Sequence, residues 1–80
     1  MKIGIIDTNI TGLSFGLLCE KNGYEVLFSN KDENFVFNLN QKVCITNEPL
    51  VQSLLFDCTK FNATTSVLDV IRESDIIFVF

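Results

Sequence analysis

The stretch MKIGIIDTNITGLSFGLLCEKNGYEVLFS, residues 1–29, decides the fold of this 80-residue chain. Residues 1–6 are short, apolar and β-branched, as expected of a strand buried on both faces. After a polar break, residues 11–22 carry leucines at helical spacing and end at Gly23, a typical helix terminator. Residues 25–29 (EVLFS) predict a second strand. This order of strand, turn, helix and strand predicts a right-handed βαβ unit.

The middle of the chain predicts two helices. Residues 32–41 have apolar side chains at helical spacing behind a capping residue, Asp32. Residues 42–47 predict a loop or a short extended piece. Glu48 and Pro49 then open a second helix, with the proline in the favoured first turn.

The last part of the chain predicts two more strands around one helix. Residues 61–64 form a short strand, and residues 75–80 form another that is apolar after its first residue. Thr65 or Ser66 caps the helix between them, which ends near Ser74. The side chains expected to face inward from this helix are Val67, Leu68, Val70 and Ile71.

Apolar strands that alternate with amphipathic helices indicate a parallel sheet covered on both faces. The expected fold is therefore α/β: a Rossmann-like parallel sheet with helices on both faces and four strands in the order 3-2-1-4. We expect residues 1–80 to be a single, partial domain, an incomplete doubly wound sheet from a longer chain, because the last strand has no neighbour or covering helix after it. Such an exposed sheet edge favours association, so the chain could form a homo-oligomer through it.

Composition excludes several classes of function. The net charge is −4 and the six Lys and Arg residues are scattered, which predicts no nucleic-acid binding. The apolar runs are too short to cross a bilayer, and no cleavable leader follows Met1, so we expect a cytoplasmic protein. Histidine is absent, which removes the common Ser–His and Cys–His nucleophile pairs. Cys19, Cys44 and Cys58 are interpreted as buried, reduced thiols, and no metal site is expected.

A glycine motif of the form G-x-G-x-x-G is expected between the first strand and the first helix of a dinucleotide-binding fold. Its first glycine makes a tight turn, its second lets the backbone approach the pyrophosphate, and its third allows close packing of helix and strand. Only the third glycine is present in the corresponding residues, which are Asp7, Thr8, Asn9, Ile10, Thr11 and Gly12.

The two replacements differ in their expected effect. Asp7 puts a carboxylate beside the helix N-terminus, where it could take the place of the pyrophosphate and repel it by roughly 1–4 kcal/mol at ~4 Å. Asn9 is milder, because asparagine tolerates left-handed backbone angles, but it adds side-chain atoms where the backbone must come close. Gly12 and Gly16 are interpreted as helix-packing positions.

The second strand should end in an acid that binds the ribose hydroxyls of the cofactor. Here the matching residue is Asn30, followed by Lys31. Loss of the acid beside a cation would suit a 2′-phosphate, which makes NADP an alternative to NAD. The simpler interpretation, which we favour, is a solvated turn with Asp32 as a helix cap. Thr64 ends the third strand, where ligands of such sheets bind, although the nearby hydroxyls also suit a helix cap at Ser66.

Four segments in the same order resemble the UDP-glucose/GDP-mannose dehydrogenase family. Residues 1–26 are similar to the family's first strand, glycine motif and L-S-x-G-L-L helix. Residues 47–49, followed by residues 54–55, resemble its E-P-G-L-x-x-L-L segment without the glycine. Residues 61–65 (FNATT) resemble its F-T-T-D strand end, and residues 73–79 (ESDIIFV) resemble its D-A-D-I-I-F-I strand. The resemblance spans essentially the whole chain.

This resemblance implies an NAD-dependent oxidoreductase that converts the 6-hydroxyl of a nucleotide sugar to a carboxylate in two hydride transfers. It places the catalytic cysteine and lysine and the nucleotide-sugar site beyond residue 80, so a nucleotide sugar is a partner only in a longer chain. The cofactor-binding residues that it implies are Asp7, Thr8, Asn9, Ile10, Gly12, Asn30, Lys31 and Thr64. The alternative is a degenerate Rossmann module that no longer binds cofactor and serves as a structural or protein-interaction domain.

Overall fold

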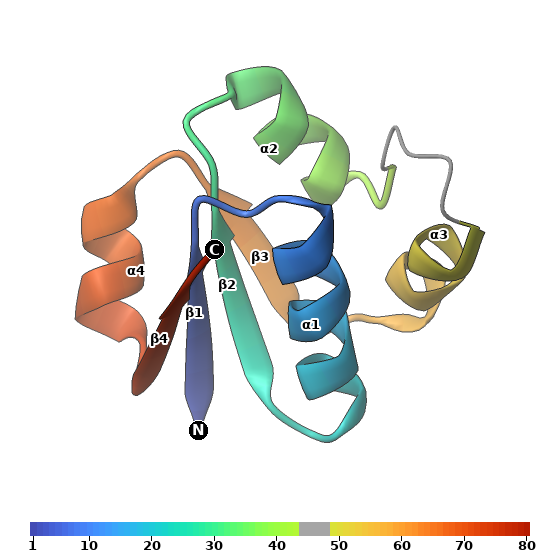
Figure 1. The fold of residues 1–80 in the computed structure, drawn as a ribbon, viewed down its shortest axis with the longest axis horizontal. Coiled ribbons are helices and arrows are strands. Elements are labelled where there is room, and N and C mark those ends of the chain that lie inside the picture. Colours follow the sequence, from blue (N-terminus) through green and yellow to red (C-terminus); the bar gives the residue numbers. More distant parts are fainter. Residues whose placement is uncertain (44–48) are drawn as a thin grey trace.

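The computed structural model describes residues 1–43 and 49–80. Strands and helices alternate along the chain (Figure 1). In chain order they are β1 (Lys2–Ile6), α1 (Ile10–Lys21), β2 (Glu25–Ser29), α2 (Glu33–Asn40), α3 (Pro49–Asp57), β3 (Phe61–Thr64), α4 (Val67–Glu73) and β4 (Ile76–Val79). Every predicted element is present, and the bounds of β2 and β3 coincide with those expected from the sequence.

The four strands form one parallel sheet in the order β3-β2-β1-β4. Helix α4 covers one face, and α1 with α3 lies on the opposite face (Figure 1). Because all strands run the same way, the loops that leave their carboxyl ends gather at one edge of the sheet. The Rossmann-like α/β fold with helices on both faces is confirmed.

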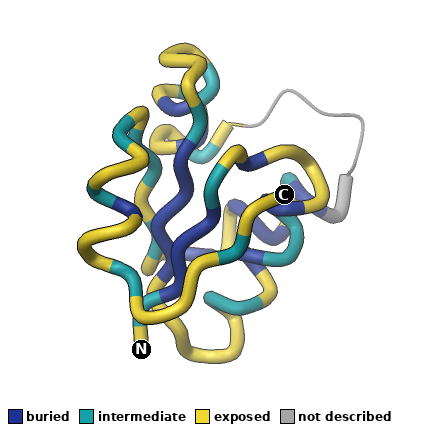
Figure 2. The backbone as a smooth tube through the Cα atoms, turned by 60° about the vertical axis from the view of Figure 1, so that its left-hand side comes forward, coloured by how far each residue is buried: buried dark blue, intermediate teal, exposed yellow. Residues whose placement is uncertain are grey.

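The main core lies between the sheet and helices α1, α2 and α3. Strands β1 and β2 appear as a continuous buried stretch through the centre of the molecule (Figure 2). Apolar side chains from both layers meet there, and each that is fully buried contributes about 1.5–3 kcal/mol. The fully enclosed members of this cluster are Ile5, Leu13, Leu17, Phe28, Leu55 and Cys58.

Polar caps fix the helix ends, as the sequence predicts. The Asp32 carboxylate accepts hydrogen bonds from the N–H groups of Asn34 and Phe35 at 2.9 and 3.3 Å. Ser66, rather than Thr65, caps α4. Helix α1 ends at Lys21 with Asn22 as its C-cap, and Gly23 follows with a positive φ of 97° that suits a residue without a Cβ. The simpler interpretation of Asp32 as a helix cap is confirmed.

The inward face predicted for α4 is wrong for three of its four residues. Val70 is fully buried, but Val67 and Ile71 are exposed and Leu68 is 71% exposed. Helix α4 has seven residues and contacts β1 and β2, so a single row of its side chains reaches the sheet. Val70 reaches it over Gly4, at which a Cβ would lie 2.5 Å from Val70 Cγ1.

The loop predicted over residues 42–47 lies mainly outside the described residues, as do Cys44 and Glu48. Its described start is Lys42, which has a positive φ of 62° directly after the C-cap of α2. Helix α3 begins at Pro49, in agreement with the predicted proline in the first turn.

Candidate functional site

The carboxyl ends of β1, β2 and β3 are joined by hydrogen bonds. The Thr8 N–H donates to the Ser29 carbonyl at 2.9 Å, and the Asn30 N–H donates to the Thr64 carbonyl at 3.2 Å. The Asn30 side-chain amide donates to the Thr8 carbonyl at 2.8 Å. Three of the predicted site residues, Thr8, Asn30 and Thr64, are thereby brought together, and the loop between β1 and α1 is held against β2.

Asn9 is the N-cap of α1. Its Oδ1 accepts a hydrogen bond from the Gly12 N–H at 2.8 Å, and its carbonyl accepts one from the Leu13 N–H at 2.8 Å. Its backbone is extended, with φ −109°, so the tolerance of asparagine for left-handed angles is not used at this position. The left-handed residue of this loop is Asp7, with φ 56°. The tight turn at the first position of the motif therefore still needs the backbone angle that glycine provides most easily.

Two donors at the start of α1 remain free. Among the described residues, the Ile10 and Thr11 N–H groups have no hydrogen-bond partner. Both residues are exposed, and they open a helix of 12 residues. Backbone N–H groups at a helix N-terminus, together with the helix dipole, form an anion-binding arrangement. The loop therefore retains donors at the place where a pyrophosphate would bind.

The Asp7 carboxylate does not cap this helix. It is exposed, and it makes no hydrogen bond or ion pair with any residue that the structure describes. Solvent and salt screen an exposed charge, so its repulsion of a phosphate falls toward the lower end of the range expected from the sequence. Asn9, by contrast, occupies one of the helix N–H groups directly.

Both polar atoms of the Asn30 amide make a hydrogen bond. Its Oδ1 accepts from the Asp32 N–H at 2.9 Å while its Nδ2 donates to Thr8. A carboxylate would offer the ribose hydroxyls two acceptor oxygens. The amide has one oxygen, and that oxygen already accepts from the Asp32 N–H. Lys31 is exposed and pairs with no described residue, and Asp32 and Glu33 follow it directly.

The remaining predicted site residues serve the scaffold. A Cβ at Gly12 would lie 2.9 Å from Phe80 Cδ2 and 3.3 Å from Ile5 Cγ2, which confirms the close packing of helix and strand. Thr64 Oγ1 accepts from the Ser66 N–H at 3.0 Å and so shapes the turn before α4.

Ser29 is a site residue that sequence reasoning missed. It is buried at the end of β2, its Oγ donates to the Ile5 carbonyl at 3.2 Å, and its own carbonyl accepts from Thr8. Within the apolar run VLFS the serine resembles an ordinary strand end. The sequence therefore held no indication that it joins β2 to the motif loop.

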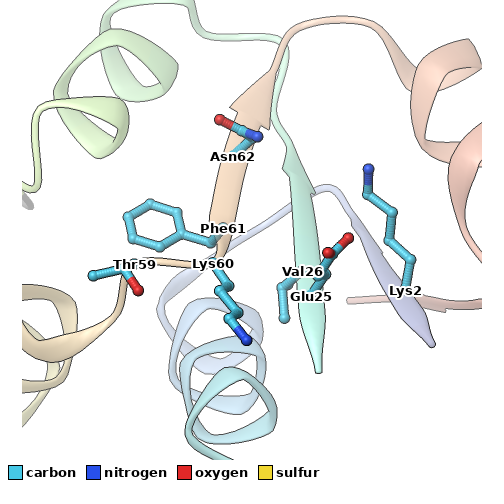
Figure 3. A pocket seen from close by; sticks show the side chains of 7 residues that line it. All are labelled: Lys2, Glu25, Val26, Thr59, Lys60, Phe61 and Asn62. Atoms are coloured by element: carbon cyan, nitrogen blue, oxygen red, sulfur yellow. The ribbon is translucent and has the colours of Figure 1, made fainter. Parts of the chain in front are cut away.

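A cavity of about 270 Å³ lies at the opposite edge of the sheet (Figure 3). It surrounds the amino ends of β2 and β3, and its charged residues are Lys2, Glu25 and Lys60. Lys2 is itself paired with Glu73 at 3.1 Å. Because ligands of parallel sheets bind beyond the carboxyl ends of the strands, this cavity is not the cofactor site.

Cys58 is a buried thiol whose ionisation should destabilise the fold. Burial, followed by the neighbouring Glu20, raises its pKa from 9.0 to about 12. Between these pH values the unfolded chain loses the proton and the folded chain keeps it. The contribution of the Cys58 thiol to the free energy of unfolding should thus be fully present below pH 9. Above pH 9 it should fall by up to about 1.4 kcal/mol per pH unit.

Denaturant unfolding of the parent chain and Cys58→Ala between pH 8 and 11 measures this effect. The free energy of unfolding of the variant should not include the decline that Cys58 causes. The difference in free energy of unfolding between the two proteins should therefore narrow as the pH rises. Parallel profiles would contradict the assignment. Cys19, whose pKa burial also raises, is present in both proteins and serves as the internal control.

Two classes of feature are not found among the described residues. No helix there combines the length and hydrophobicity needed to cross a membrane. Within the same residues, no group of three or more cysteine and acidic side chains is placed to hold a metal ion.

Comparison with solved structures finds the same fold in dehydrogenases. GDP-mannose dehydrogenase from Pseudomonas aeruginosa, in a ternary complex, has a TM-score of 0.92 and 22% identity over 100% of this chain and 19% of that one. UDP-glucose dehydrogenase from Pyrobaculum islandicum has a TM-score of 0.90 and 14% identity over 98% of this chain and 19% of that one. UDP-D-ManNAc dehydrogenase from Pyrococcus horikoshii has a TM-score of 0.87 and 20% identity over 100% of this chain and 20% of that one. The chain thus spans about a fifth of their length.

Sequence comparison gives the family. A search of curated proteins finds no match to this chain. The family model described as the NAD-binding domain of the UDP-glucose/GDP-mannose dehydrogenase family, however, matches residues 1–80 in full. The chain therefore belongs to the UDP-glucose/GDP-mannose dehydrogenase family, and its residues correspond to that family's NAD-binding domain.

Proposed function

We propose that this chain is the NAD-binding segment, a single partial domain, of a cytoplasmic nucleotide-sugar dehydrogenase. The enzyme would oxidise a sugar 6-hydroxyl to a carboxylate. The observation that carries the proposal is the pair of free N–H groups, Ile10 and Thr11, at the start of α1. They lie where the fold binds a pyrophosphate. The free thiols Cys19 and Cys58 suit a reducing compartment.

The role of the segment is to hold and orient the cofactor. A bound nicotinamide dinucleotide supplies the hydride acceptor. Within this chain, Ile10 and Thr11 would donate to the pyrophosphate, and Thr8 and Asn30 would keep the loop in position through their hydrogen bond of 2.8 Å. The nucleotide sugar and the catalytic groups would bind elsewhere in a longer chain.

Local charge supports NAD over NADP. Lys31 is the single cation at the end of β2, and Asp32 and Glu33 are its immediate neighbours. The Asp32 carboxylate already accepts from the first N–H groups of α2, including that of Asn34. A 2′-phosphate would therefore meet two carboxylates and a helix N-terminus that is in use.

A degenerate module without cofactor is the second candidate. It is supported by the engaged amide of Asn30, which replaces the ribose-binding acid, and by Asn9, which occupies the Gly12 N–H. In that case the three joined strand ends would serve only the stability of the sheet.

Titration calorimetry of the folded chain with NAD and then NADP separates these candidates. We expect NAD to bind and NADP to bind at least tenfold more weakly, a difference of about 1.4 kcal/mol. Circular dichroism confirms that the chain is folded. A folded chain that binds neither dinucleotide at millimolar concentration would favour the degenerate module. Tighter binding of NADP would refute the charge argument while retaining the enzyme assignment.

A further inference from the structure

The turn between α1 and β2 contains a chemically labile pair, Asn22 followed by Gly23 (Figure 1). Asn22 is the only one of the eight asparagines that precedes a glycine, and no aspartate of the chain precedes one. Asparagine loses ammonia most readily before glycine, because the missing side chain lets the next backbone nitrogen approach the amide carbon. The pair lies at the opposite end of α1 from the proposed cofactor site.

Deamidation of such a pair is a reaction of the backbone with one side chain. The Gly23 nitrogen attacks Cγ of Asn22, a bond forms between these two atoms, and the bond from Cγ to Nδ2 breaks. The proton of the Gly23 N–H departs with Nδ2 as ammonia. Water then opens the cyclic imide at either of its two carbonyl carbons, and the product is aspartate or isoaspartate. Water is the only other reactant.

The folded turn holds the reacting atoms apart. The Gly23 N–H donates to the Glu20 carbonyl at 2.9 Å, and Asn22 Nδ2 donates to the Leu18 carbonyl at 2.8 Å. The ψ angle of Asn22 is 12°, which places the Gly23 nitrogen beside the backbone nitrogen of Asn22 and away from its Cβ. Ring closure therefore requires that both hydrogen bonds break and that the backbone rotates about the Cα–C bond.

The same turn lies where local opening is easy. Residues 21–25 are all exposed, and nothing except the chain neighbours of Gly23 lies within 4 Å of the position that its Cβ would occupy. Hydrogen bonds at an exposed helix end open far more often than those in the core. Water and hydroxide therefore reach the pair whenever the last turn of α1 opens.

We propose that Asn22 is a deamidation site and that opening of the last turn of α1 sets its rate. The carboxylate that replaces the amide no longer donates to the Leu18 carbonyl, and it adds a negative charge at the helix C-terminus, where the macrodipole disfavours it. Isoaspartate also adds one carbon to the main chain within the three-residue connection, 22–24, between α1 and β2. Both products therefore weaken the turn that protects Asn22.

Incubation of the full chain in mildly alkaline buffer, with and without urea, measures the rate in the unfolded and folded states. Peptide mapping locates the modified residue, and methyl transfer by an isoaspartate methyltransferase counts the isoaspartate. Because no aspartate precedes a glycine, this signal comes from Asn22. We expect modification at Asn22 in both states, and a rate at least about tenfold lower in the folded chain, whose folding circular dichroism confirms.

A matched pair of variants at Lys21, an exposed residue of the last turn of α1, tests the role of local opening. Lys21→Gly and Lys21→Ala remove the same charge, but glycine is the far poorer helix former. In the folded state Lys21→Gly should form isoaspartate at least about threefold faster than Lys21→Ala. In urea the two variants should react at the same rate. Asn22→Gln should form none in either state.

Equal rates in the folded and the urea-unfolded parent chain would overturn the proposal, because the turn would then give no protection. Isoaspartate that persists in Asn22→Gln would place the modification at another residue. Folded Lys21→Gly that reacts no faster than folded Lys21→Ala would show that opening of the last turn of α1 does not set the rate.

Discussion

Gly16→Ala should lower the stability of the chain by about 2–3 kcal/mol, although alanine is the better helix former. A Cβ at this position would overlap Phe28 Cε1 and lie 2.6 Å from Phe28 Cζ. The ring is fully buried and contacts Phe61 edge to face at 6.0 Å, so it has no free space to move into. Overpacking of this kind costs about 1–3 kcal/mol or more and exceeds the gain of up to about 1 kcal/mol in helix propensity. For so small a domain the melting temperature should fall by roughly 10–20 °C.

Thermal unfolding of two further variants tests the cause. In the Phe28→Leu background the same glycine replacement should cost less, because leucine leaves room for a methyl group, and the double-mutant cycle gives the coupling. Gly12→Ala should cost less than Gly16→Ala, since a Cβ at Gly12 would lie 2.9 Å from Phe80 Cδ2, a looser contact than the one with the Phe28 ring, and Phe80 is exposed. A Gly16→Ala protein as stable as its parent would show that α1 lies farther from β2 than described.

The double variant Asp7→Gly/Asn9→Gly should bind NAD at least tenfold more tightly than the parent chain. Replacing the Asn9 side chain frees the Gly12 N–H, which becomes a third donor next to the N–H groups of Ile10 and Thr11. Removing Asp7 eliminates a negative charge beside the phosphates and places glycine where φ is 56°. Loss of the cap to glycine costs only a few tenths of a kcal/mol, so the fold should persist.

The two contributions can be separated by calorimetry. Asp7→Asn removes the charge but keeps a residue that tolerates the left-handed conformation, and it isolates the electrostatic part. Asn9→Gly alone isolates the effect of the freed N–H. If the double variant binds NAD no better than the parent chain, the weakness lies instead at Asn30 or in structure outside this chain.

Most of the fold could be predicted from the sequence because its determinants are local. Apolar runs, Gly23 and the caps Asp32 and Ser66 each act within a few residues, and each is confirmed. The inward face of α4 could not be predicted in this way. Periodicity shows which side of a helix is apolar, but the neighbouring elements determine how much of that side is covered.

The site was less predictable, because its hydrogen bonds join distant residues. Asn30 contacts Thr8 across 22 positions, and Asn40 contacts Ala63 across 23. No spacing rule predicts such pairs. The conformation of the loop between β1 and α1 also depends on which of its residues has the left-handed backbone conformation. Asn9, which would tolerate this angle, stays extended as the N-cap of α1, and the left-handed residue is Asp7.

Amide chemical shifts of the 80-residue chain during a titration with NAD would show whether the start of α1 binds the pyrophosphate. We expect saturable shifts that are largest at the Ile10 and Thr11 amides, with smaller ones at Thr8 and Asn30. A folded chain whose amides do not shift, or whose largest shifts lie at the cavity around Glu25 and the amino end of β3, would contradict it.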